Sequence, residues 1–436
     1  MIMDNFSFIA SFPAAAVLTI FLLVACRYTG AAGLIHLIHR IPKHLAQAIT
    51  KAPPPNASVS PSIPSSSPLK AIQEPSLPPD WFTSPTLFAL ESRAVHSTTW
   101  YALLHTSRLA TPGSYLTLTL ATYPLILIRG RDDVVRAFHN VCRHRAYAVA
   151  RKETGKSLVL RCGYHGWCYD ARGRLVKAPH FEGVEGFARE ENGLFEVGCQ
   201  TDETGAVWVN LDRRKERGMP EGNEIGEWAG EREMRMEEGV WVEGWDVEGE
   251  FNWKVAAQRP GAIDCPSPFF RSHWTDRLFS TLGWFRRNSQ SAAETKGSLA
   301  TSMLTSIHSI PGTSTWVTTT VFPVSTARSK VRFDVYSSRA PKGFTVKPRD
   351  MEAMKQQSEA WVRWLAETQS NINGDGGLEA MSTASLETQH WVLKQLKAHL
   401  KLEQVAGGEI FPASPRSGKP AGSLQSVGGL EHRNYV

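Results

Sequence analysis

The 436-residue sequence has few cysteines, little net charge and a low mean hydropathy. Six scattered cysteines are too few for a disulfide-stapled secreted domain. The 48 Lys and Arg exceed the 42 Asp and Glu by only six, and 14 Trp and 19 Phe accompany them, which argues against a nucleic-acid-binding tail. A mean hydropathy of −0.25 excludes a polytopic membrane protein. The chain is long enough for two or three domains, and a 42% hydrophobic content allows a buried core.

One uncharged apolar run lies near the N-terminus. Residues 8–26 are 19 residues without a charge, about the length that crosses a ~30 Å hydrocarbon core. No Lys or Arg precedes the run, whereas Arg27, Arg40 and Lys43 follow it. This pattern predicts a single-pass membrane anchor over residues 1–44, with the body of the protein on the cytosolic side, most simply of the endoplasmic reticulum. A buried helix or a targeting peptide is the alternative interpretation.

Two segments have compositions typical of unstructured chain. Residues 45–79 form a linker whose second part is rich in Pro and Ser, and residues 406–436 are rich in Gly, Ser and Pro. Such segments bury little apolar surface, so we expect a semi-extended spacer and a disordered tail. The densely charged stretch at 212–250 is interpreted as a solvated helix and loop that joins two domains.

Two short motifs contain the residues with the clearest chemistry. Cys142 and His144 form a C-x-H pair, and Cys162 and His165 form a C-x-x-H pair after 17 intervening residues. The surrounding sequence alternates in short apolar runs broken by turn residues, which indicates antiparallel β-structure. Two thiolates and two imidazoles on neighbouring loops suit either a zinc ion or a [2Fe–2S] cluster. One Cys and one His per loop favours the asymmetric cluster, with both Cys on one iron and both His on the other.

The segments around these motifs, NVCRHRAYAVA and CGYHGWCYDARGRLVKAPHF, resemble the cluster loops of Rieske non-haem iron oxygenases of the choline monooxygenase-like kind. The resemblance implies that Cys142, His144, Cys162 and His165 bind the [2Fe–2S] cluster in a domain spanning residues 80–235. We interpret the other cysteines, Cys26, Cys168, Cys199 and Cys265, as small buried hydrophobic residues.

The resemblance also implies a second domain, over residues 236–405, with a mononuclear Fe(II) held by two His and one carboxylate. The motif that precedes the iron ligands in the family is present as Asn252, Trp253 and Lys254, but the expected acidic residue and close His pair do not follow. His273 and His308 stand alone, and each is interpreted as a surface or satisfied core histidine.

Downstream, the resemblance returns in a weaker form. Residues 315–338 alternate like paired strands, and 351–372 have helical spacing. Residues 381–400 resemble the closing helix of the family. Glu359 and Glu367 are the candidates for the carboxylate ligand before Gln369, although a solvated helix face explains both equally well. Catalytic residues are therefore not identifiable from the sequence. Either the iron site has been lost, or the stretch at about 258–298 replaces a segment that carried it.

The predicted fold is α+β: an N-terminal anchor, a β-rich cluster domain and a helix-grip (START-like) domain. The resemblance implies an O₂-dependent monooxygenase that receives electrons from a reductase or ferredoxin, and a homotrimeric assembly. The substrate would be a choline-like amine, or a lipophilic compound if the anchor is real. The alternative is a membrane-tethered [2Fe–2S] electron carrier or an inactive relative without the mononuclear iron.

Overall fold

The computed structural model describes residues 77–212, 218, 223–258, 297–310, 313–338, 347–374 and 383–412. Residues 73–436 group into one unit by their contacts. The predicted anchor, the linker up to residue 76 and the tail beyond residue 412 lie outside the described residues, as do Cys26, Cys265 and His273. Within the described ranges, no helix has the length and apolar character needed to span a bilayer.

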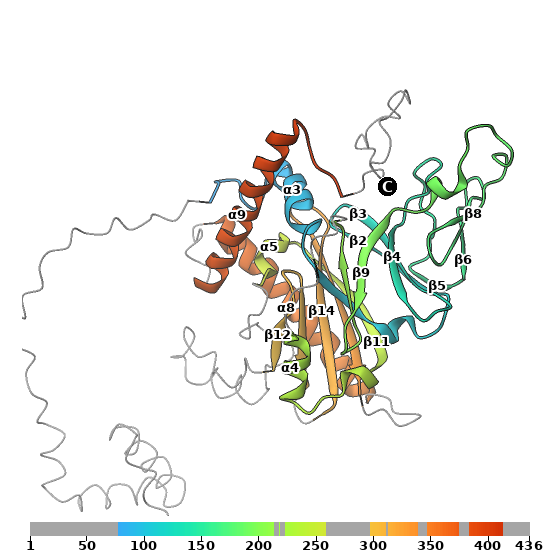
Figure 1. Cartoon of the computed structure of the whole chain (residues 1–436). Coiled ribbons are helices and arrows are strands. Elements are labelled where there is room, and N and C mark those ends of the chain that lie inside the picture. Colours follow the sequence, from blue (N-terminus) through green and yellow to red (C-terminus); the bar gives the residue numbers. More distant parts are fainter. Residues whose placement is uncertain are drawn as a thin grey trace, which may run out of the picture. The chain divides into compact units, whose positions relative to one another are not determined.

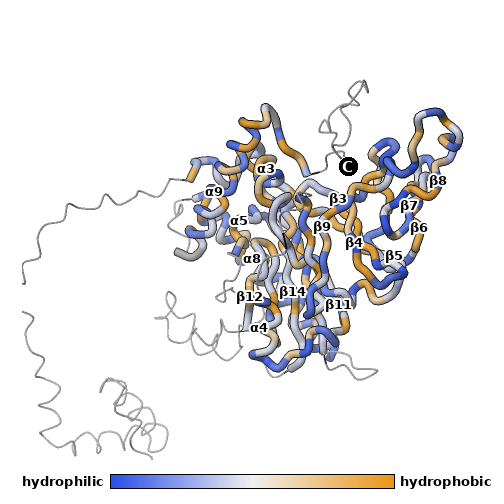
Figure 2. Tube along the Cα trace, in the orientation of Figure 1, coloured by the Kyte–Doolittle hydropathy of each residue, from blue (hydrophilic) through white to orange (hydrophobic). Residues whose placement is uncertain are grey.

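The N-terminal part of the fold is an antiparallel β domain, as the alternating sequence predicts. Its seven strands follow the order β1-β10-β9-β4-β3-β2-β5. Their bounds are β1 (Tyr101–His105), β2 (Ser114–Leu120), β3 (Tyr123–Arg129), β4 (Val135–His139), β5 (Thr154–Lys156), β9 (Glu196–Thr201) and β10 (Ala206–Asn210). Figure 2 shows hydrophobic residues along β3 and β4, in the middle of this sheet, and the four aliphatic side chains of β3, residues 125–128, are fully buried.

A smaller sheet extends from this domain and is made of three-residue strands, β6 (Val159–Arg161), β7 (Cys168–Asp170) and β8 (Leu175–Lys177). It has its own hydrophobic cluster, in which Cys142, Cys162, Trp167 and Tyr169 are buried together with Phe138. Figure 1 shows this small sheet at the end of the β domain away from the long helices. We call residues 140–193, which contain it, the cluster lobe.

The second half is an α+β domain built on a five-stranded antiparallel sheet in the order β11-β15-β14-β13-β12. Its strands are β11 (Val240–Gly249), β12 (Ser298–Ala300), β13 (Thr305–Ser309), β14 (Thr315–Pro323) and β15 (Ser329–Ser337). The predicted pairing of residues 315–338 is confirmed as the β14–β15 hairpin, with Thr319 opposite Phe333.

Two long helices, α8 (Pro348–Asn373) and α9 (Thr383–Ala406), complete this domain. Helix α8 confirms the helical spacing of residues 351–372, and α9 forms where the resemblance implied a closing helix. Pro348 occupies the first turn of α8, where its missing N–H removes no hydrogen bond. Met354, Val362 and Leu365 recur at helical spacing on the buried face of α8, and Trp245 of β11 donates to Ser358 Oγ over 2.8 Å. The helix is therefore fixed against the sheet by apolar burial and by this buried hydrogen bond.

The interpretation of residues 212–250 as only a solvated helix and loop is wrong. Short helical turns are present, α4 (Glu224–Gly230) and η4 (Met236–Glu238), but residues 240–249 form β11, an edge strand paired along its length with β15. The strand was missed because the many carboxylates of this stretch made it look like a solvated segment. Alternation places Trp241, Trp245 and Val247 among partly buried side chains packed on the hydrophobic core, while Asp246 and Glu248 are exposed.

Candidate functional site

The two cysteine motifs lie on loops with the same backbone design. Cys142 N donates to Tyr147 O over 2.7 Å, and Cys162 N donates to Trp167 O over 2.8 Å, five residues on in each case. The residue four positions after each cysteine, Ala146 or Gly166, donates its N–H to that cysteine's carbonyl and has a positive φ, 53° or 72°. Each loop thus turns back on itself behind its cysteine, which places the two pairs in equivalent settings.

The structure brings the four predicted site residues together. Both cysteines are 2% exposed and belong to one buried cluster, and electrostatic interaction between them contributes to the pKa of Cys142. The rings of His144 and His165 lie 4.6 Å apart, centroid to centroid. His144 also stacks on Trp167, with 5.0 Å between centroids and 7° between planes. The two predicted Cys–His pairs, one on each loop, therefore lie together in space.

His144 Nδ1 is buried and accepts or donates no hydrogen bond. An unpartnered buried polar atom is costly, typically by about 1–3 kcal/mol, unless a ligand or water completes it. Burial, with the neighbouring His165 and Arg145, lowers the pKa of His144, so its imidazole is held in the neutral form that ligates metal. This orphaned nitrogen shows that the donor set fits an absent metal group.

The two cysteines of the site are buried from solvent, and one hydroxyl group lies beside them. Cys142 Sγ lies 3.3 Å from the hydroxyl of Tyr169, which also accepts the Arg143 N–H over 3.0 Å. Burial raises the pKa of the Cys142 thiol in the metal-free protein. Tyr169 is placed to hydrogen-bond a thiolate at Cys142 once a metal removes its proton.

No set of three or more His, Cys, Asp or Glu side chains among the described residues is gathered around a single ion position. A two-iron cluster needs only two side chains per iron, so this finding does not count against the four residues. Of the described cysteines outside the motifs, Cys168 is buried as predicted, whereas Cys199 is only partly buried. Cys168 is buried with its Sγ 3.2 Å from Gly166 O, Cys199 lies 3.5 Å from Val135 O, and both thiols are free.

The second predicted motif forms a buried structural junction. Asn252 caps the short helix α5 (Trp253–Ala256): its side-chain oxygen accepts the N–H of Lys254, and its own N–H donates to the side-chain oxygen of Gln369. Trp253 donates to Glu91 over 2.7 Å, and Lys254 forms an ion pair with the same carboxylate. Glu91 ends the N-terminal helix α3 (Pro85–Glu91), so the motif joins segments more than 160 residues apart.

This ion pair is almost fully buried, with side-chain exposures of 1% for Lys254 and 0% for Glu91. Burial raises the pKa of Glu91 and lowers that of Lys254, in spite of their mutual attraction. The ammonium is also 4.8 Å from the ring centroid of Trp81. The lysine is therefore enclosed by its own protein and is not available to a ligand.

The candidate ligands of a mononuclear iron are not assembled within the described residues. His308 is a satisfied core histidine, as predicted: Nε2 lies 2.9 Å from Ser306 Oγ, Nδ1 lies 2.9 Å from Ser298 Oγ, and burial lowers its pKa to about 3. Glu359 and Glu367 are both exposed on α8, which confirms the solvated-face interpretation. Gln369 is buried and bound to the Asn252 junction.

A small cavity between β13, β14 and α8 was not predicted. Its lining includes Thr319 and Trp361, whose Oγ1 and Nε1 atoms are buried without hydrogen-bond partners. It also includes Gln258, two residues after α5. The volume is about 10 Å³, the room of a single water-sized group. The three consecutive threonines of β14, residues 318–320, were the available signal, because they are all buried and bring hydroxyl groups into an otherwise apolar strand.

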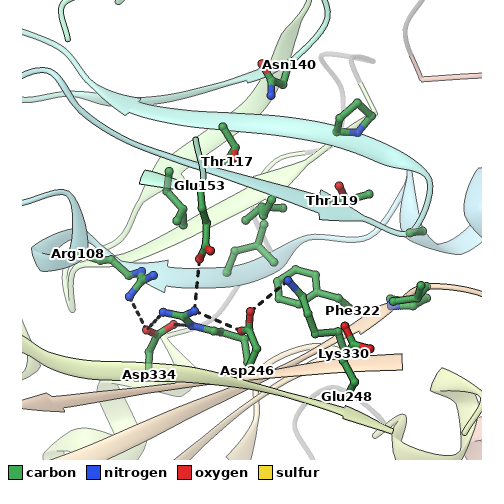
Figure 3. A pocket seen from close by; sticks show the side chains of 18 residues that line it. Arg108, Thr117, Thr119, Asn140, Glu153, Asp246, Glu248, Phe322, Lys330 and Asp334 are labelled. Atoms are coloured by element: carbon green, nitrogen blue, oxygen red, sulfur yellow. Dashed lines mark hydrogen bonds and ion pairs between the residues drawn. The ribbon is translucent and has the colours of Figure 1, made fainter. Parts of the chain in front are cut away.

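A larger cavity, about 490 Å³, lies between the two sheets, and its lining mixes cations and carboxylates (Figure 3). Asp334 joins several of the charged groups. Its carboxylate accepts hydrogen bonds from Arg108 over 2.7 Å and from Trp241 Nε1 over 2.8 Å, and it forms an ion pair with Arg332. Arg332 also reaches Glu153 at 3.4 Å. Most of these charges neutralise one another across the cavity. We call this network of Arg108, Asp334, Arg332 and Glu153 the ion-paired seam between the two domains.

Comparison with known proteins agrees with this geometry. Residues 99–188 match the family model of the Rieske [2Fe–2S] domain. The chain is 31% identical over 135 residues to the carnitine monooxygenase oxygenase subunit of Acinetobacter baumannii, covering 31% of this chain and 36% of that protein. It is 37% identical over 136 residues to the glycine betaine monooxygenase oxygenase subunit of Chromohalobacter salexigens, covering 31% and 30%. The matches thus span about a third of these relatives.

The fold similarity extends further than the sequence similarity. The structure of the quaternary ammonium Rieske monooxygenase CntA with L-carnitine superposes with a TM-score of 0.56 at 20% identity, covering 73% of this chain and 95% of that one. The α+β half described above therefore has the fold of a Rieske oxygenase subunit. The chain carries a Rieske [2Fe–2S] domain, and its homologues are the oxygenase subunits of Rieske oxygenases.

Proposed function

We propose that this protein is the oxygenase-type subunit of a Rieske monooxygenase, with Cys142, His144, Cys162 and His165 as the ligands of its [2Fe–2S] cluster. The observation that supports the ligand assignment is the convergence of both loops, with His144 Nδ1 buried and unpartnered at the centre. When bound, the cluster supplies one-electron redox chemistry.

The protein's own residues prepare that site in three ways. The low pKa of His144 keeps its imidazole neutral, and Trp167 fixes the ring plane by stacking. Tyr169 offers its hydroxyl to Cys142, which stabilises a thiolate there. Burial of both cysteines excludes water from the sulfur side, whereas His165 is only partly buried and lies toward the surface.

The substrate class is proposed from the relatives, whose names specify carnitine and glycine betaine. A quaternary or tertiary amine is therefore the first substrate to test, and a lipophilic compound is the second if residues 8–26 anchor the chain. A reductase or ferredoxin is proposed as electron donor, and a homotrimer as the assembly. The anchor, the cytosolic orientation and the endoplasmic reticulum remain predictions from the sequence.

An electron carrier or inactive relative without the mononuclear iron is the second candidate function. It is favoured by the described half of the α+β domain, where His308 is hydrogen-bonded at both nitrogens and Glu359 and Glu367 face solvent. These residues therefore do not supply an iron site.

Metal analysis separates the two functions. The full chain, reconstituted with iron and sulfide, is assayed for iron per chain, for its visible and EPR spectra and for coupled oxidation of L-carnitine and glycine betaine. Two irons with a Rieske spectrum and no oxidation support the carrier, and a third iron with coupled O₂ uptake supports the oxygenase. A colourless, zinc-containing protein contradicts both.

A further inference from the structure

Helix α9 has one buried face and one basic face. Its buried residues recur every three or four positions, at 392, 396, 399 and 403, which places them on one side of the helix. The other side carries Lys394, Lys397 and Lys401 at the same kind of spacing, and all three lysines are exposed. Figure 1 shows α9 at the edge of the fold, next to α3. The basic face of α9 is therefore turned away from the core.

The positive charge of this face is not neutralised by the protein. None of the three lysines forms an ion pair with any described residue. The helix has only two acidic residues, Glu387 near its start and Glu403 near its end. Glu403 is buried and paired with Arg93 at 2.8 Å, and Glu409 beyond the helix is paired with the same arginine at 3.1 Å. The lysines are therefore available to an anionic partner.

The basic face ends in exposed apolar side chains. Val405, the next position along this face, is 90% exposed, while Leu402 and Phe411 are 44% and 45% exposed. The segment that follows the helix is held beside its end, because Ile410 N donates to the buried Glu403 carboxylate over 3.1 Å. Exposed apolar side chains next to a row of lysines are typical of helices that lie on a membrane surface.

The chain also enters the described fold beside this helix. Trp81, close to the first described residue, donates from Nε1 to Gln389 Oε1 of α9 over 2.8 Å. Helix α3 then leads into a short π-helix, η1 (Ser92–His96), which packs against α9. Residues 8–26, predicted to be a membrane anchor, are thus joined through the linker to the part of the fold that carries the basic face.

We propose that Lys394, Lys397, Lys401, Leu402 and Val405 form a contact surface for a lipid bilayer that contains anionic lipids. The lysines attract the headgroups, and the apolar side chains enter the bilayer at headgroup level. Lysine is depleted at the centres of protein–protein interfaces, which favours a lipid surface over a second copy of the chain or an acidic protein. The surface uses none of the proposed cluster ligands, so it is separate from the proposed function.

Amide hydrogen exchange of the full chain tests the contact, because it reports on the end of α9 whether or not residues 8–26 insert. The chain with its reconstituted cluster is mixed with vesicles of phosphatidylcholine alone or with about 30% phosphatidylserine. We expect exchange over residues 400–411 to slow at least about 5-fold with the anionic vesicles and to be unchanged with the neutral ones. Added salt should remove this protection.

A charge-reversal variant tests the basic face. In K397E/K401E, exchange with anionic vesicles should return to within about 2-fold of the vesicle-free rate. The matched control, K152E/K156E, makes the same change in net charge at exposed lysines of the cluster lobe and should keep the protection. Without vesicles, both variants should exchange like the unsubstituted chain, which shows that α9 is intact.

A second pair of variants tests the apolar end. Val405→Asp is expected to reduce the protection at least about 3-fold, whereas Val405→Leu should keep it. Val134→Asp is the matched control, because Val134 is a 49% exposed valine in the turn before β4, and it should leave the protection unchanged.

Several results would overturn the surface. One is equal exchange of residues 400–411 with neutral and anionic vesicles, and another is equal loss of protection in K397E/K401E and its control. Protection that appears without vesicles as the protein concentration rises would assign the face to a contact between copies. Equal protection by soluble polyglutamate would assign it to an acidic protein. None of these results changes the iron content or the Rieske spectrum, which test the proposed function separately.

Discussion

The cluster lobe and the interior of the five-stranded domain differ in whether their titratable side chains have partners inside the protein. In the lobe, His144 Nδ1 is buried without a partner, and Arg145 and Arg161 are exposed without ion pairs among the described residues. In the five-stranded domain His308 is hydrogen-bonded at both nitrogens and Lys254 is sealed against Glu91. Donors left without partners are available to a ligand, whereas donors paired internally hold the fold together. Among these titratable groups, the ones without partners therefore lie in the lobe.

The largest effect expected from this comparison is at the cysteine thiols. Replacing Cys142 by Ser removes one of two sulfur ligands, so we expect complete loss of the visible and EPR signature of the cluster. Cys168→Ser is the matched control, because Cys168 is equally a buried free thiol of the lobe but contacts only a carbonyl. Equal loss of colour in both variants would mean that the two cysteines do not differ in role.

The next largest effect is at the buried junction. Lys254→Met leaves Glu91 buried without its cation, and we expect a loss of about 3–5 kcal/mol in the free energy of unfolding, measured by urea denaturation. The double variant E91Q/K254M removes both charges and should be less destabilised than the single one. A single variant as stable as the unsubstituted chain would show that the pair contributes nothing to the junction.

A smaller effect is expected at the ion-paired seam between the domains. Asp334→Asn keeps the size of the side chain but weakens its bonds to Arg108, Arg332 and Trp241, for an expected loss of about 2–3 kcal/mol. Added salt should not reproduce this loss, because the Asp334 side chain is only 4% exposed and is poorly screened. Asp132→Asn, at an exposed carboxylate paired with Arg136 and Arg172, should destabilise the protein less than Asp334→Asn, because exposed ion pairs are screened by solvent.

The smallest effect is a dependence on pH. Burial lowers the pKa of His308 from an ordinary 6.5 to about 3, so the unfolded chain takes up the proton first as the pH falls. The stabilisation by neutral His308 is complete above pH 6.5 and declines below it, by about 2 kcal/mol between pH 6.5 and pH 5. His96, also buried with a pKa of about 3, adds a similar slope. In His308→Gln, the free energy of unfolding should fall less steeply between pH 6.5 and pH 5, because the contribution of His308 is removed. An unchanged slope would show that the protonation of His308 does not affect stability in this range.

The cluster site was predictable because its information is local. Four ligands in two short motifs, with a turn behind each cysteine, specify their own geometry without reference to the rest of the chain. Helix α8 and the β14–β15 hairpin were predictable for a similar reason, since their periodicity lies within single segments, whereas α9 was expected from the family resemblance. Strand β11 was missed because the acidic residues interspersed along it obscured the alternation of Trp241, Trp245 and Val247.

The sequence by itself determined the ligand types, their spacing and the order of β-rich and helical segments. Only the tertiary structure decided which polar groups are available. Lys254 meets Glu91 across 163 positions, and Arg108 meets Asp334 across 226. No local pattern encodes such pairs, because they depend on how the whole chain packs. The same packing closes His308 within the core and leaves Tyr164 exposed beside His165.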